Sequence, residues 1–111
     1  MDCLFCKIAA GEIDSKRVYE DDRVVAFRDI NPAAPVHVLV VPREHVSRIS
    51  EAGEEHAELI GRLHLAAGKI AEAEGLKDYR LVINCGEGAG QSVFHVHLHL
   101  LGGRPMSWPP G

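Results

Sequence analysis

The clearest pattern in the chain is an alternation of histidine and apolar residues within the segment Val93–Leu101. The histidines are His95, His97 and His99, and the apolar residues around them are Phe94, Val96, Leu98 and Leu100. Successive side chains of a β-strand point to opposite faces of a sheet. The pattern therefore predicts a strand that presents three imidazoles on one face and turns the four apolar side chains toward the core.

Shorter apolar stretches predict four further strands. They are Val18–Glu20, Val24–Phe27, Val36–Val41 and Arg80–Asn84. Asp21 and Asp22 predict the turn of a hairpin between the first two. Asn31–Pro35 is expected to be a loop, because two prolines so close together do not fit inside a sheet. The β-branched run Val36–Val41 predicts a central strand.

The remaining periodicity is helical. Leu59, Leu63 and Ile70 belong to a stripe of apolar residues spaced three and four apart, which predicts one long helix over Glu54–Glu74. Cys3–Ala10 predicts a short N-terminal helix. We therefore expect an α+β fold in which a five-stranded antiparallel sheet packs with these two helices as one domain over residues 1–111.

Charge and hydropathy narrow the class of protein. The chain of 111 residues is 46% hydrophobic and has a formal net charge of −4. This charge argues against a general nucleic-acid binder, which needs a basic surface, but it allows a small phosphate ligand. No apolar run is long enough to span a bilayer, and the N-terminus lacks the pattern of a secretory signal. We expect a cytoplasmic protein that binds neither nucleic acid nor membrane.

The spacing Cys3-x-x-Cys6 is typical of a metal or redox pair in a protein without an export signal. A structural zinc site with two cysteines needs two histidines from elsewhere in the chain. The alternative is a pair of half-buried cysteines on a helical turn.

Three interpretations of the histidine row stay open at this point. The row is either the polar outer face of an ordinary strand, a catalytic zinc site of three imidazoles, or a site in which the middle imidazole is a nucleophile toward phosphorus. Imidazole suits the last task because its ordinary pKa of about 6.5 leaves it neutral near pH 7. The glycine-rich segment Gly88–Ser92 favours the nucleophile, since small residues let backbone N–H groups approach a phosphate.

The heptapeptide His95–Leu101 resembles the histidine triad (HIT) family, whose pattern is His-φ-His-φ-His-φ-φ with φ apolar, at every position. Other segments resemble the family in the expected order; these are Glu20–Asp22, Phe27–Pro32, Ala34–His37 and Pro42–His45. The ending Gly102–Gly111, with its Trp-Pro-Pro-Gly terminus, resembles the Hint branch in particular. The resemblance covers nearly the whole chain.

This resemblance implies a HIT-like fold and a homodimer that hydrolyses purine nucleoside phosphoramidates and related nucleotidyl conjugates. By analogy His97 attacks the α-phosphorus to give a nucleotidyl-histidine, which water cleaves to an AMP- or GMP-type product. His99 contacts phosphate oxygens and His95 orients the nucleophile. No metal is required for this chemistry.

The resemblance also implies a binding site for each part of the substrate. Phe5, Phe27 and Ile30 line a purine slot, and Asp29 accepts hydrogen bonds from the ribose hydroxyls. The residues expected to hold the phosphate or leaving group are Asn84, Gly90, Gln91 and Ser92. Trp108 reaches toward the partner subunit's site, and His37 lies near the active site. Taken alone, these residues also fit simpler roles: core packing for the apolar ones, a turn for Asp29 and a tail anchor for Trp108.

Bacterial-type members of the family with the cysteine pair are similar in a further respect, because they use histidines at the positions of His45 and His95. The resemblance thus implies a structural zinc bound by Cys3, Cys6, His45 and His95. Four protein ligands leave no open position, so this zinc is not the catalyst.

Three other functions remain as alternatives. One is a dinucleoside polyphosphate hydrolase of the Fhit type, against which the Trp-Pro-Pro-Gly ending argues. Another is a nucleotide-binding adaptor whose catalysis is incidental. The third is the zinc enzyme with three histidine ligands, which predicts that a chelator abolishes activity.

Overall fold

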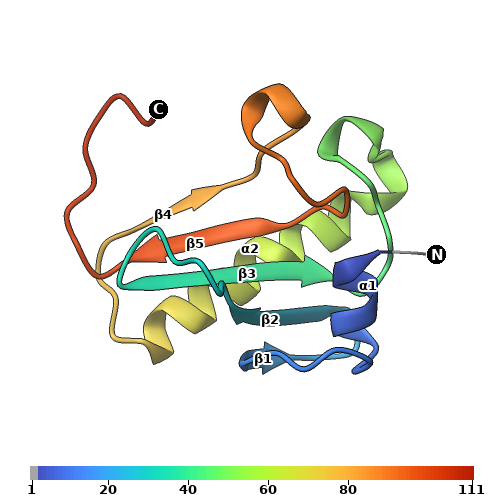
Figure 1. The fold of residues 1–111 in the computed structure, drawn as a ribbon, viewed down its shortest axis with the longest axis horizontal. Coiled ribbons are helices and arrows are strands. Elements are labelled where there is room, and N and C mark those ends of the chain that lie inside the picture. Colours follow the sequence, from blue (N-terminus) through green and yellow to red (C-terminus); the bar gives the residue numbers. More distant parts are fainter. Residues whose placement is uncertain (1–2) are drawn as a thin grey trace.

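The computed structural model describes residues 3–111 and has a five-stranded antiparallel sheet with one helix on each face (Figure 1). The strands are β1 (Arg17–Glu20), β2 (Val24–Arg28), β3 (Val36–Pro42), β4 (Tyr79–Val82) and β5 (Leu98–Gly102). The helices are α1 (Leu4–Ala9) and α2 (Ala57–Ala73). The strand order is β1-β2-β3-β5-β4, so β3 is central as predicted and the α+β architecture is confirmed.

Helix α2 packs on one face of the sheet through the predicted stripe. Leu59, Leu63 and Ile70 are buried, and Leu63 and Ile70 share the core with alternate residues of β2, β3 and β5. The helix begins at Ala57, later than predicted, because Glu54–His56 forms a 3-10 turn in which the Gly53 N–H donates to Nδ1 of His56. Within residues 3–111 no helix is both long and apolar enough to cross a membrane.

Helix α1 covers part of the opposite face. Phe5 and Ile8 of α1 pack on Phe27 of β2 and on Leu39 and Val41 of β3, and all five side chains are buried. Figure 1 shows α1 in front of the ends of β2 and β3, while α2 runs behind the sheet. Helix α1 therefore covers part of the sheet face that carries the histidines.

The predicted strand Val93–Leu101 begins later than expected. Regular pairing starts at Leu98, and His95 and His97 precede it because the Val96 N–H bonds to the carbonyl of Val46 outside the ladder. The pairing of β4 with β5 ends at Val82, opposite His99. The strand predicted over Arg80–Asn84 is observed at Tyr79–Val82, so it begins and ends earlier than predicted.

The alternation of faces is confirmed for three of the four apolar residues. Val96, Leu98 and Leu100 are buried in the core beneath α2. The prediction is wrong for Phe94, which is 37% exposed. This residue lies before the strand, and the guanidinium of Arg48 lies 5.0 Å from the centre of its ring.

Candidate active site

The register of the sheet brings the histidines together on the α1 face. Leu39 of β3 is paired with His99 of β5 on one side and with Phe27 of β2 on the other. His95 is fully buried and His97 is 6% exposed. The interpretation of the row as a polar outer face is therefore wrong, because α1 and its contacts remove these imidazoles from water.

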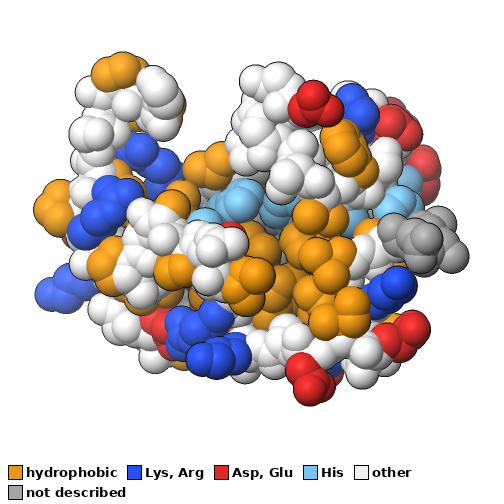
Figure 2. All heavy atoms as spheres, viewed as in Figure 1, with side chains coloured by type: hydrophobic (Ala, Val, Ile, Leu, Met, Phe, Trp, Pro, Cys, Tyr) orange, Lys and Arg blue, Asp and Glu red, His pale blue; other side chains and the backbone are white. Residues whose placement is uncertain are grey.

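A cavity of about 830 Å³ opens beside His97 and His99. Its walls come from α1 and the following loop, from the end of β2 with the loop after it, and from the segment before β5. Besides the two histidines, the lining residues include Leu4, Phe5, Ile8, Ile13, Ser15, Phe27, Asp29, Ile30, Leu39, Ser92 and Val93. Figure 2 shows histidine side chains beside a patch of hydrophobic ones on this face. The cavity thus combines an apolar wall with two imidazoles.

The ring of His97 is held in a fixed orientation. Its Nδ1 lies 2.8 Å from the carbonyl oxygen of His95, which only accepts hydrogen bonds, so Nδ1 carries the proton and Nε2 keeps its lone pair. The ring of Phe5 packs edge-on at 5.0 Å between centroids. Burial lowers the pKa of His97, although the hydrogen bond to His95 and the charge of Asp29 oppose the shift. The result is a neutral imidazole with a free ring nitrogen.

His37 and His99 form a directed chain of hydrogen bonds. The Ala33 N–H donates to Nδ1 of His37 at 2.9 Å, so His37 carries its proton on Nε2. That Nε2 lies 2.9 Å from Nδ1 of His99 and donates to it. The proton of neutral His99 therefore resides on Nε2.

Nε2 of His99 is a buried nitrogen without a hydrogen-bond partner in residues 3–111. Burial and the neighbouring histidines lower the pKa of His99 to about 4. A buried N–H donor without a partner is unfavourable. His99 lines the cavity, and an anion or oxygen acceptor that reached Nε2 would satisfy this donor.

Asp29 stabilises the turn after β2 and also faces the histidines. Its Oδ1 accepts the Asn31 N–H at 2.8 Å, which agrees with the simpler expectation of a turn residue. Its Oδ2 lies 3.4 Å from Nε2 of His37. Asp29 also lines the cavity, so the turn places a carboxylate at the site.

The three residues expected to form a purine slot all line the cavity but differ in exposure. Phe5 and Phe27 are buried and pack edge-on, with centroids 5.4 Å apart. Ile30 is 92% exposed at the rim. Leu39 was missed by sequence reasoning, although its place two residues after His37 in a strand puts it on the histidine face.

The loop before β5 contributes less to the cavity than expected. Ser92 lines it, whereas Asn84, Gly90 and Gln91 are not among its walls. The buried Gln91 amide donates to the carbonyls of Ser47 and Val93, and its Oε1 accepts the Gly86 N–H. Gln91 therefore holds the loop in shape.

Trp108 lies apart from the cavity. Its side chain is 81% exposed, and the guanidinium of Arg80 lies 5.9 Å from the ring centre. Hydrogen bonds also anchor the tail, because Arg80 donates to the carbonyl of Ser107 and Arg104 donates to the carbonyl of Ala33.

A second cluster joins the start of α1 to the histidine segment. It consists of Cys3, Cys6, His45 and His95. Nδ1 of His95 lies 3.3 Å from Sγ of Cys3, 3.5 Å from Sγ of Cys6 and 3.2 Å from Nδ1 of His45. Nε2 of His95 donates to the carbonyl of Pro42 at 2.7 Å, which leaves Nδ1 with the lone pair that a metal needs.

The spacing of this donor set suits zinc. Zinc bonds of about 2.0–2.3 Å in a tetrahedron separate neighbouring ligand atoms by about 3.3–3.8 Å. The separations in this cluster, 3.2–3.5 Å, are close to that range. Without a cation, burial and the adjacent Cys3 raise the pKa of Cys6 to about 11. The group can therefore hold a metal ion whose charge would stabilise the thiolates.

A zinc site of three triad imidazoles is not formed by the described residues. Nδ1 of His95 points into the cysteine cluster, while Nδ1 of His97 is bound to a carbonyl. The three rings therefore do not direct free nitrogens to one point.

Comparisons with known proteins agree with the fold. The model of the HIT domain family matches residues 10–106. The chain is 51% identical to an uncharacterized HIT-like protein of Synechococcus elongatus, with 99% of this chain and 97% of the relative aligned. It is also 51% identical to a 14 kDa zinc-binding protein of Zea mays, over 97% of this chain and 87% of the relative.

A solved structure of similar shape is that of a HIT family hydrolase from Legionella pneumophila Philadelphia 1. It superposes with a TM-score of 0.97 at 52% identity and covers 99% of this chain and 100% of its own. The chain described here therefore belongs to the HIT domain family.

Proposed function

We propose that this protein is a Hint-type hydrolase that cleaves purine nucleoside phosphoramidates and related nucleotidyl conjugates to nucleoside monophosphates. The observation that carries the proposal is the fixed orientation of His97. Its Nδ1 is bound to the carbonyl of His95, so Nε2 is the free nitrogen of a neutral ring beside the cavity. A relative of similar shape is named a HIT family hydrolase, which supports the reaction class.

His97 is the proposed nucleophile. Nε2 forms a bond to the α-phosphorus while the P–N bond to the leaving amine breaks, and the amine departs with a proton taken up from solvent. Water then attacks the nucleotidyl-histidine, the bond from phosphorus to Nε2 breaks, and a proton returns to solvent. The hydrogen bond to His95 keeps the same nitrogen available in both steps.

His99 is the proposed donor to the phosphate. Its Nε2–H is buried and has no partner in the described chain, and it belongs to a residue that lines the cavity. A hydrogen bond from this group to a non-bridging phosphate oxygen would strengthen as negative charge develops there. His37 fixes the direction of the donor by occupying Nδ1 of His99.

The remainder of the cavity is proposed to hold the nucleoside. Phe5, Phe27 and Ile30 provide an apolar slot of the kind that suits a purine, and Asp29 provides a carboxylate for the ribose hydroxyls. Ser92 lines the cavity and is proposed to contact the phosphate or leaving group. Asn84, Gly90 and Gln91 would then shape the loop that presents Ser92. The purine preference in this proposal follows from the resemblance to the Hint branch.

Two further features belong to the proposal. Cys3, Cys6, His45 and His95 would bind a structural zinc, in line with the name of the maize relative, and the ion would fix His95 and thereby its carbonyl. The protein would act as a homodimer in which the exposed Trp108 reaches the partner subunit's site.

The test is mass spectrometry of protein quenched during turnover of adenosine 5′-phosphoramidate. We expect an adenylyl adduct on the peptide that contains His97. An adduct on another residue, or turnover with no covalent adduct even under rapid quench, contradicts the mechanism.

A parallel assay separates the related functions. Faster turnover of a dinucleoside polyphosphate than of the phosphoramidate would identify the Fhit-type hydrolase instead. AMP binding without turnover of either compound would identify a nucleotide-binding adaptor.

A further inference from the structure

Helix α1 forms a wall of the active-site cavity, although it has only six residues. Phe5 of α1 packs against His97, and Leu4, Phe5 and Ile8 line the cavity. A helix this short is not stable by its own hydrogen bonds. Contacts with other parts of the chain must therefore determine where α1, and with it Phe5, is placed.

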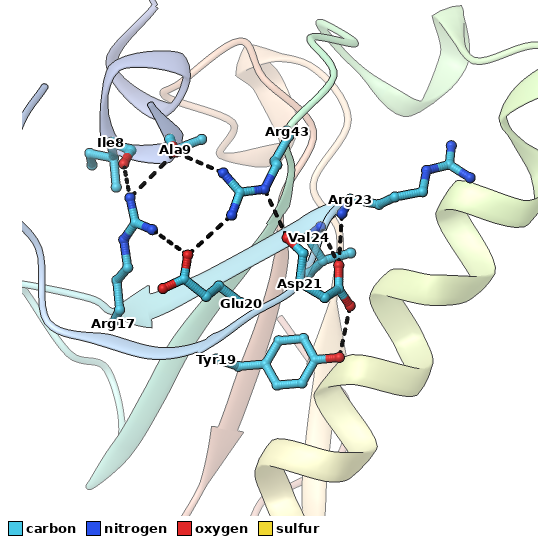
Figure 3. Close-up of polar contacts among 9 residues, drawn as sticks. All are labelled: Ile8, Ala9, Arg17, Tyr19, Glu20, Asp21, Arg23, Val24 and Arg43. Carbon is cyan, nitrogen blue, oxygen red and sulfur yellow. Dashed lines mark hydrogen bonds and ion pairs between the residues drawn. The ribbon is translucent and has the colours of Figure 1, made fainter. Parts of the chain in front are cut away.

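The carboxyl end of α1 is held by two arginines, one from β1 and one from the segment directly after β3, as Figure 3 shows. Arg17 of β1 donates through Nη2 to the carbonyls of Ile8 at 2.7 Å and Ala9 at 3.3 Å. Arg43, directly after β3, donates through Nη1 to the same Ala9 carbonyl at 3.0 Å. Carbonyls at the end of a helix carry partial negative charge and favour cationic donors. The Ile8 carbonyl also accepts the Gly11 N–H at 3.0 Å.

The two guanidinium groups are themselves fixed in position. Oε2 of Glu20 lies 2.8 Å from Nη1 of Arg17 and 3.1 Å from Nη2 of Arg43, so one carboxylate bridges both. Nε of Arg43 also donates to the carbonyl of Asp21 at 2.9 Å. Every nitrogen of Arg43 is therefore used, in a pattern that the single ammonium of lysine does not reproduce.

These contacts lie at the opposite end of α1 from the cysteine cluster. Cys3 caps the start of the helix and Cys6 lies in its first turn, where both meet His45 and His95. Arg43 stands two residues before His45, so the segment after β3 reaches both ends of α1. The helix thus has two independent attachments, one through the cysteines and one through the arginines.

We propose that Arg17 and Arg43 are positioning residues of the active site, which hold α1 by its carboxyl end so that Phe5 keeps its place against His97 and along the cavity. The consequence for ligand affinity rests on the proposed nucleotide site. Because Phe5 would contact the base rather than the reacting phosphorus, loss of the arginines should weaken binding more than it slows the chemical step.

The experiment compares wild-type protein with the double variant Arg17→Gln/Arg43→Gln and the control Arg62→Gln. Arg62 is a partly exposed arginine that pairs with Glu58 on α2, away from α1. AMP affinity is measured by calorimetry, KM and kcat with adenosine 5′-phosphoramidate, and mobility of residues 3–11 by hydrogen exchange. We expect AMP binding and KM of the double variant to weaken about tenfold with kcat within about threefold of wild type, and faster exchange confined to α1.

Arg43→Lys should give an intermediate loss, since lysine binds one carbonyl, and Arg62→Gln should behave as wild type. A folded double variant with unchanged AMP affinity and unchanged exchange in α1 overturns the inference. Failure of wild-type protein to bind AMP contradicts the proposed function instead, and the exchange measurement still tests whether the arginines hold α1.

Discussion

Nε2 of His37 donates to Nδ1 of His99 over 2.9 Å, and the carboxylate of Asp29 lies 3.4 Å from the same Nε2. The position of the proton on His99 therefore depends on His37 of β3 and on the charge of Asp29, which follows β2. Burial lowers the pKa of both histidines, while Asp29 opposes the shift because a negative charge stabilises an imidazolium.

Asp29→Asn is expected to lower the pKa of His37 and His99 further. The sign follows from removing the one neighbouring charge that favours their protonated forms, and asparagine keeps an oxygen acceptor for the Asn31 N–H. The measurement is NMR titration of the histidine ring C–H resonances. Asp22→Asn serves as the control, since Asp22 does not influence these pKa values. An unchanged or raised pKa of His99 in Asp29→Asn would show that the charge does not act on this pair.

His97→Ala is expected to reduce kcat/KM for adenosine 5′-phosphoramidate by at least about 10⁴-fold, because no other group replaces an attacking nitrogen. AMP should still bind, with calorimetry giving a Kd within a few fold of wild type. The matched control is His64→Ala, which removes an exposed histidine of α2. Retention of more than a tenth of the activity would exclude His97 as the nucleophile.

Cys6→Ser is expected to abolish zinc binding and lower Tm, while kcat/KM stays within several fold because the ion is not the catalyst. Metal analysis of protein purified without chelator should give one zinc per chain for wild type and for Cys85→Ser. Cys85 is a free thiol outside the cluster, so Cys85→Ser tests whether loss of a cysteine elsewhere also lowers the zinc content. Wild-type protein free of zinc would refute the metal site.

Leu63→Ala is expected to destabilise the protein by about 2–5 kcal/mol, because it leaves a cavity in a fully buried position. Leu65→Ala, two residues further along α2, should cost about 0.5 kcal/mol or less since that side chain is 70% exposed. Urea unfolding gives both values. Equal losses would mean that α2 packs with a different face than the one described.

The sequence predicted the elements of this fold where a local period determined them. The alternation around His97 placed Val96, Leu98 and Leu100 in the core, and the helical stripe of α2 was found with the same reasoning. Strand ends were less accurate. Regular β5 begins at Leu98 because Val96 bonds to Val46, a contact between segments far apart in the chain.

The candidate site could be predicted in part for the same reason. Residue spacing indicated the imidazole row and the cysteine pair, and the family resemblance named their proposed partners. Neither the spacing nor the resemblance indicated that Phe94 would be exposed. Nor did they indicate that the side chain of Gln91 would hydrogen-bond to backbone groups and not to a ligand. These outcomes depend on which backbone groups and charges happen to lie nearby after folding.

What the sequence by itself determined was the set of reactive groups and their order along each strand, because side-chain direction follows from the backbone period. Only the tertiary structure decided which ring nitrogen of His97 is free, that His37 meets His99, and that α1 is held at both ends. Hydrogen bonds and burial between distant segments fix these features, and no local pattern of residues encodes a distance across the fold.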